Sequence, residues 1–179
     1  MGLYSQKPKT YVPPTTSMNP TMLGGAPTQA APQAPAPTGE RTAVAVDLPG
    51  QPGTYLDSEF APKVDAFVQY AREAGHDIQL SSGYRTQAEQ DELKRSGKSL
   101  MPAEQSLHSA GLAVDVNNFD RLPDATQLAI RQAAERAGLS WGGSFGDKRH
   151  FFIDPIPGQD RTQLIANFAE QVRRLQSRP

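Results

Sequence analysis

Two histidines and one aspartate, His108, Asp115 and His150, carry the side-chain types that bind a divalent cation. Residues 112–117 alternate between apolar and other side chains, which predicts a strand that packs one face on a core and presents Asp115 on the other. His150 opens a second apolar strand, predicted at 150–154. If these two strands are neighbours, Asp115 and His150 face each other, and His108 folds over them from the preceding turn.

This set of donors predicts a zinc site. Two imidazoles, one carboxylate and one open position are typical of catalytic zinc, whereas structural sites are usually closed by four protein ligands. Zinc polarises a carbonyl group and lowers the pKa of a bound water to about 7, so a second carboxylate is needed to take the proton of that water. Asp147, three residues before His150, is placed for that role. The third histidine, His76, follows a glycine that ends a helix, and it is interpreted as a surface residue.

The candidate ligands must be positioned by the predicted secondary structure. Helices and short strands are mixed in it without a βαβ repeat. Apolar spacing and capping residues predict helices at about 58–74, 86–95, 124–137 and from Asp160 onward, and strands at 43–48, 77–82, 112–117 and 150–154. Thr86 and Asp124 are the expected caps of the second and third helices, and Asp160 with Gln163 forms a capping box for the last. The prediction is one α+β domain over residues 41–179, with flanking helices on a small, largely antiparallel sheet.

Residues 1–40 differ in composition from the rest of the chain. They hold 8 of the 16 prolines and only three charged residues. Proline removes backbone donors and favours extended conformations, so this segment is predicted to be an extended low-complexity arm, acting either as a free linker or as a docking arm that binds a partner.

The overall composition excludes several classes of function. The net charge of −1 gives no general electrostatic attraction to nucleic acid. Without cysteine there is no disulfide, thiolate metal site or cysteine nucleophile. The sequence has no run of about 20 apolar residues, so no membrane span is predicted. No signal peptide is recognised at the N-terminus, so the protein is expected to be made in the cytoplasm.

Several short motifs follow one another in the order seen in zinc peptidases of bacterial cell walls. They are Ser-Gly-Tyr-Arg at 82–85, Ser106-x-His108-x-x-Gly111-x-Ala113-x-Asp115, and Trp141-Gly142-Gly143 with Asp147-x-x-His150-Phe151. Over about residues 55–155 the chain resembles the D-alanyl-D-alanine carboxypeptidase family, which includes vancomycin-resistance dipeptidases. It looks most similar to the phage and bacterial L-alanyl-D-glutamate endopeptidase branch.

The resemblance implies a Hedgehog/D,D-peptidase-like fold and a role for each matching residue. His108, Asp115 and His150 would bind Zn²⁺, and Asp147 would be the general base. Carboxypeptidase members usually place glutamate in that role, so an aspartate favours the endopeptidase branch.

Three further residues have two interpretations each. Arg85 either steadies the oxyanion or a substrate carboxylate through its planar donors, or lies on the surface and caps helix carbonyls. Ser106 binds substrate or fixes the turn before His108. Trp141 walls the cleft or fills the core.

The sequence thus predicts a zinc-dependent peptidoglycan peptidase that cuts a stem-peptide amide, with L-alanyl-D-glutamate as the expected bond. It would act on the bacterial cell wall as a phage-type lytic enzyme, either released at lysis or carried in a phage particle. In the particle, the arm would dock on a virion or tail protein. The alternatives are a D,D-carboxypeptidase or dipeptidase, and a structural virion protein that retains the peptidase fold.

Overall fold

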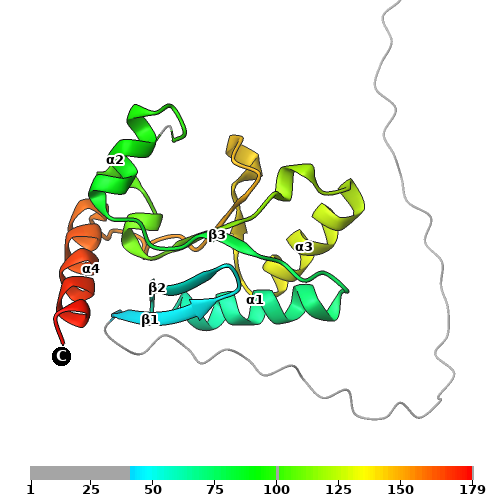
Figure 1. The fold of residues 1–179 in the computed structure, drawn as a ribbon, viewed down its shortest axis with the longest axis horizontal. Coiled ribbons are helices and arrows are strands. Elements are labelled where there is room, and N and C mark those ends of the chain that lie inside the picture. The colour runs from blue at the N-terminus through cyan, green and yellow to red at the C-terminus, as the bar shows by residue number, and fades with distance from the viewer. Residues whose placement is uncertain (1–40, 100, 179) are drawn as a thin grey trace, which may run out of the picture. The chain divides into compact units, whose positions relative to one another are not determined.

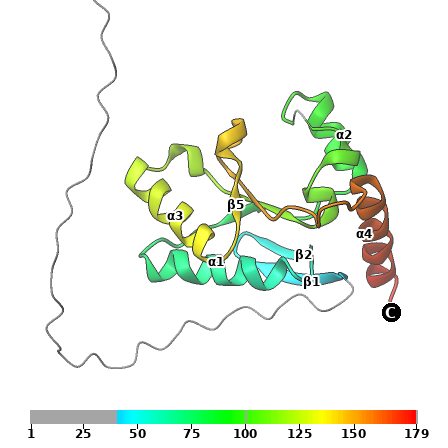
Figure 2. The same ribbon diagram turned by 180° about the vertical axis from the view of Figure 1, so that it is seen from behind.

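The structure is a computed structural model that describes residues 41–99 and 101–178. The predicted arm at 1–40 and its docking lie outside these residues. Within the described residues, four α-helices flank two small antiparallel sheets, so the predicted α+β class is confirmed. In both views α2 and α4 lie at one end of the domain and α3 lies at the other (Figures 1 and 2).

The first sheet is a hairpin of β1 (Ala43–Leu48) and β2 (Gln51–Asp57), joined by a two-residue turn at Pro49-Gly50. β1 confirms the predicted strand, whereas β2 was not predicted because it begins Gln-Pro-Gly-Thr. Proline and glycine normally indicate a turn, but proline is tolerated at the start of a strand and on an edge strand. The hairpin docks on the second sheet, where the Leu80 N–H donates to the Pro49 carbonyl (2.7 Å).

The second sheet has the order β3-β4-β6-β5, and every neighbouring pair is antiparallel. Its strands are β3 (Leu80–Ser82), β4 (Ala113–Val116), β5 (Ser140–Trp141) and β6 (His150–Phe152). β3 begins later than the predicted 77–82 strand, because its first residue, Leu80, pairs with Val116, the last residue of β4. β4 and β6 are neighbours, as the predicted metal site requires.

The helices are α1 (Ala61–Glu73), α2 (Gln87–Arg95), α3 (Asp124–Arg136) and α4 (Arg161–Gln176). Thr86 and Glu89 form a full capping box at the start of α2, which confirms Thr86 as the cap. The helix predicted at about 124–137 is confirmed as α3, but Asp124 is not its cap, because Pro123 is the N-cap and Asp124 is the first helical residue. Asp160 caps α4 by accepting from the Gln163 N–H, as predicted. The Gln163 side chain donates to Asn167 along the helix, so it does not supply the return bond of the predicted capping box.

The core lies between the sheets and the helices α1 and α3. Its largest fully buried side chains include Leu56, Phe60, Phe67, Leu80, Leu112, Phe119, Ile130 and Phe151. Val114 and Val116 of β4 also contribute, so the predicted apolar face of this strand is confirmed. No helix in residues 41–99 and 101–178 is both long enough and apolar enough to cross a bilayer.

Gly111 joins the turn at His108 to β4, and alanine there is expected to destabilise the fold. Gly111 has φ +68°, and an added Cβ would lie 2.2 Å from Cζ of Phe168. The left-handed conformation and the clash together should lower the free energy of unfolding by about 2–4 kcal/mol. Gly97→Ala is the control: Gly97 has φ +72°, and apart from its chain neighbours no atom of the described residues lies within 4 Å of the added Cβ, so it should lose only about 1 kcal/mol. Urea denaturation measures both, and equal losses would contradict the predicted clash.

Candidate metal centre

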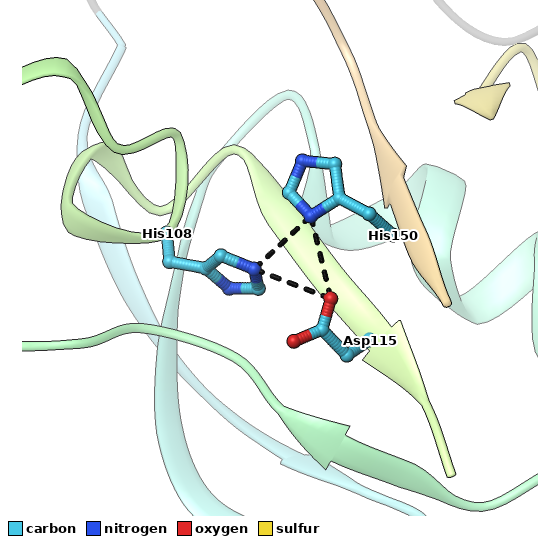
Figure 3. A group of neighbouring side chains, drawn as sticks. All are labelled: His108, Asp115 and His150. Atoms are coloured by element: carbon cyan, nitrogen blue, oxygen red, sulfur yellow. Dashed lines mark hydrogen bonds and ion pairs between the residues drawn. The ribbon is translucent and has the colours of Figure 1, made fainter. Parts of the chain in front are cut away.

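The turn, the central strand and its neighbour bring the three predicted ligands together. His108 lies in a 3-10 turn (His108–Ala110), and Asp115 and His150 are directly paired across β4 and β6. All three side chains are buried, and Figure 3 shows them pointing toward one another. His108 Nε2 lies 3.2 Å from His150 Nδ1, and Asp115 Oδ1 lies 3.4 Å from the first nitrogen and 3.3 Å from the second. The predicted convergence is therefore present.

These distances fit a tetrahedral cation. Zinc bonds of about 2.0–2.1 Å place neighbouring ligand atoms about 3.3 Å apart in a tetrahedron. The three atoms therefore lie close to the corners of one tetrahedral face, and no fourth His, Asp or Glu from residues 41–99 and 101–178 joins this group.

The hydrogen bond on the far side of the His108 ring also fits a metal. His108 Nδ1 lies 2.8 Å from the Gly83 carbonyl oxygen, and because a carbonyl only accepts, Nδ1 must carry the hydrogen. In the neutral ring Nε2 then presents a lone pair toward Asp115 Oδ1, and two facing lone pairs repel unless a cation lies between them. Fixing the ring through its other nitrogen is the usual arrangement for a metal-binding histidine.

Electrostatics favours the ligand forms of His108 and Asp115. Burial lowers the pKa of His108, and the attraction of Asp115 does not reverse this effect, so the ring stays neutral to lower pH. Burial raises the pKa of Asp115, but His108, His150 and Arg85 together outweigh it and hold that pKa well below its usual value. A neutral imidazole and an ionised carboxylate are the forms that bind metal.

Arg85 holds the Asp115 carboxylate by the oxygen that faces away from the two histidines. Its Nε donates to Ser82 Oγ (2.8 Å), one terminal nitrogen donates to Gln90 Oε1 (3.3 Å), and the other donates to Asp115 Oδ2. The side chain is only 19% exposed, so the interpretation of Arg85 as a surface residue is wrong. Its contact with an oxyanion or a substrate carboxylate stays a prediction.

Asp147, Ser106 and Trp141 lie outside the ligand group. Asp147 is exposed in the loop before β6, and its carbonyl accepts from the His150 N–H (3.4 Å). Ser106 is 4% exposed, and its carbonyl accepts from the Ser109 N–H (3.1 Å), which is a placement suited to fixing the turn. Trp141 packs against the core and donates from Nε1 to the Lys148 carbonyl (2.7 Å). A contact of Ser106 or Trp141 with substrate stays a prediction.

Sequence reasoning missed two supporting groups, the Gly83 carbonyl and Gln90. A backbone acceptor has no sequence signature, although Gly83 does stand inside the motif at 82–85. A Cβ at Gly83 would lie 2.6 Å from Thr54 Oγ1, so the close approach of the hairpin requires glycine there. Gln90 lies on a polar helix, where a single glutamine does not stand out.

The match to a protein-family model agrees with the resemblance found in the sequence. The family model described as D-alanyl-D-alanine carboxypeptidase matches residues 101–153, a segment that holds all three ligand candidates and Asp147. A search of solved structures finds the crystal structure of the Serratia marcescens L-Ala D-Glu endopeptidase ChiX, with 27% identity over 52% of this chain and 79% of that chain and a TM-score of 0.40. A search of curated proteins finds no match.

Proposed function

We propose that this protein is a zinc-dependent peptidase that hydrolyses an amide in the stem peptide of peptidoglycan. The observation that carries the proposal is the convergence of His108 Nε2, Asp115 Oδ1 and His150 Nδ1 at 3.2–3.4 Å. The family match over residues 101–153 supports peptidase chemistry at these same residues.

In this proposal three side chains bind the metal and a fourth acts as the general base. When bound, zinc supplies Lewis-acid polarisation of the scissile carbonyl and lowers the pKa of a coordinated water. His108, Asp115 and His150 would hold the ion through His108 Nε2, Asp115 Oδ1 and His150 Nδ1. The Asp147 carboxylate takes the proton of the attacking water and passes it to the leaving amine. Asp147 is exposed to solvent, and its carbonyl accepts from the His150 N–H (3.4 Å), so its backbone is tied to that of a proposed ligand.

The L-alanyl-D-glutamate bond is the proposed site of cleavage. The support is the aspartate at 147, where the resemblance to carboxypeptidases would place a glutamate. The description of the matching family model favours the second candidate, removal of a terminal D-alanine.

Product analysis of a defined muropeptide distinguishes these two activities. We expect wild-type protein with zinc to convert N-acetylmuramoyl-pentapeptide into N-acetylmuramoyl-L-alanine and a free tetrapeptide that begins with D-glutamate, both identified by mass spectrometry. Loss of a single D-alanine would establish the carboxypeptidase instead. Full activity after chelation and removal of zinc would overturn the metal mechanism for either bond.

The route to the wall forms a separate part of the proposal, which rests on the sequence alone. Release at lysis and delivery in a phage particle both remain predictions. A structural virion protein would neither bind zinc nor release products from the muropeptide, so the same experiment tests that alternative.

A further inference from the structure

A glutamine is buried where an apolar residue would be expected. Among the residues of α2, all of which the structure describes, Gln90 is the only buried one, with 1% of its surface exposed. A buried amide is unfavourable unless its donors and its acceptor are bonded, and here they all are. Its Nε2 donates to Ser99 Oγ (2.8 Å) and to the Met101 carbonyl (3.0 Å), and its Oε1 accepts from Arg85.

Those contacts continue to the metal centre. The Arg85 nitrogen next to the one held by Gln90 donates to Asp115 Oδ2. The other carboxylate oxygen, Oδ1, faces His108 and His150 at 3.4 and 3.3 Å. Gln90 is thus two hydrogen bonds away from the carboxylate that would bind zinc.

The hydrogen bond from Arg85 to Gln90 limits the orientation of the guanidinium group, and through it the orientation of the Asp115 carboxylate. The guanidinium group is planar, so fixing it at Nε by Ser82 and at one terminal nitrogen by Gln90 sets the direction of the remaining nitrogen. That nitrogen occupies Asp115 Oδ2, so Oδ1 alone is turned toward the two histidines.

We propose that Gln90 is a positioning residue for the metal centre, which acts through Arg85 to hold Asp115 as a one-oxygen ligand. This inference rests on the proposed function, because it gives Asp115 the role of a zinc ligand. Gln90 itself does not touch substrate or the ion.

A double-mutant cycle on zinc affinity tests the coupling. Gln90→Met keeps the volume of the side chain and removes the acceptor of Arg85, and Arg85→Met removes the contact with Asp115. Loss of an outer partner of a metal ligand typically weakens metal affinity about 10–100-fold, so each single variant is expected to bind zinc at least about 10-fold more weakly. Because Gln90 acts through Arg85, the double variant should be no weaker than Arg85→Met alone. Additive losses would overturn the proposal.

Gln90→Glu provides a second measurement that separates positioning from folding. The carboxylate keeps an acceptor for Arg85 but has no hydrogen to donate to Ser99 or Met101. Zinc affinity near that of wild type is expected, even where Gln90→Met fails to fold. A loss as large as that of Arg85→Met would place the role of Gln90 in its contacts with Ser99 and Met101 and would overturn the proposal. Gln87→Met, at an exposed glutamine on the same helix, is the matched control and should leave zinc affinity unchanged.

Competition with a chromophoric chelator measures these affinities without any peptidase assay, so the two proposals fail in different ways. A wild type that binds zinc but releases no product from peptidoglycan contradicts the proposed function and leaves the cycle measurable. A wild type that cleaves the muropeptide, with Gln90→Met binding zinc as tightly, contradicts only the positioning role. A wild type that binds no zinc overturns both.

Discussion

Replacement of His108 by alanine is expected to abolish both zinc retention and peptide hydrolysis. His108 supplies one of the three ligand atoms, and its ring is fixed by the Gly83 carbonyl. Apparent binding energies of about 10–16 kcal/mol for four-ligand zinc sites suggest roughly 2.5–4 kcal/mol for each ligand. Removing one ligand should therefore weaken zinc binding by about 10²–10³-fold. Metal analysis after dialysis and the muropeptide assay measure the two effects.

His76→Ala is the matched control for this substitution. His76 is a half-exposed histidine outside the ligand group, so zinc content and activity should match those of wild type. Retention of one equivalent of zinc by His108→Ala would mean that the ion is held elsewhere in the chain.

Replacement of Asp147 by asparagine is expected to remove hydrolysis while zinc stays bound. Asparagine keeps the size of the side chain but cannot accept the proton of the attacking water. A positioned general base contributes about 10²–10⁴-fold to rate, so kcat should fall by that factor with little change in KM. Because Asp147 lies outside the ligand group, the zinc content should stay at one equivalent.

The distinction between the two variants is the informative result. Asp120→Asn, at another exposed aspartate, is the control and should keep full activity. If Asp147→Asn also lost its zinc, Asp147 would be a ligand. If it kept full activity, another group would be the base.

The sequence predicted the centre of this site well because its signal is local. The alternation over 112–117 places Asp115, and the short strand at His150 places its partner, so a single assumption of strand pairing brings the two together. The pairing of Asp115 with His150 bears out that assumption. Thr86 was identified as a cap for the same reason, since a capping box lies within four residues.

What the sequence could not provide depends on contacts between distant segments. β2 is a strand only because β1 pairs with it, although Pro52 and Gly53 indicate a turn. The sequence left two interpretations open for Arg85, because its hydrogen bonds to Gln90 of α2 and to Asp115 of β4 form only when these segments pack together. The role of the Gly83 carbonyl depends on the fold alone.

Because Asp115 and His150 are directly paired, some segments of the fold can change in length and others cannot. Side chains alternate along a strand, so a one-residue slip of β6 against β4 would turn His150 to the opposite face. The segment 142–146 is not bound by this register, whereas Asp147, the proposed base, lies three residues before His150 and its carbonyl accepts from the His150 N–H (3.4 Å). We therefore expect changes in loop length to be tolerated before Asp147, whereas an insertion between Asp147 and His150 would move the proposed base away from His150.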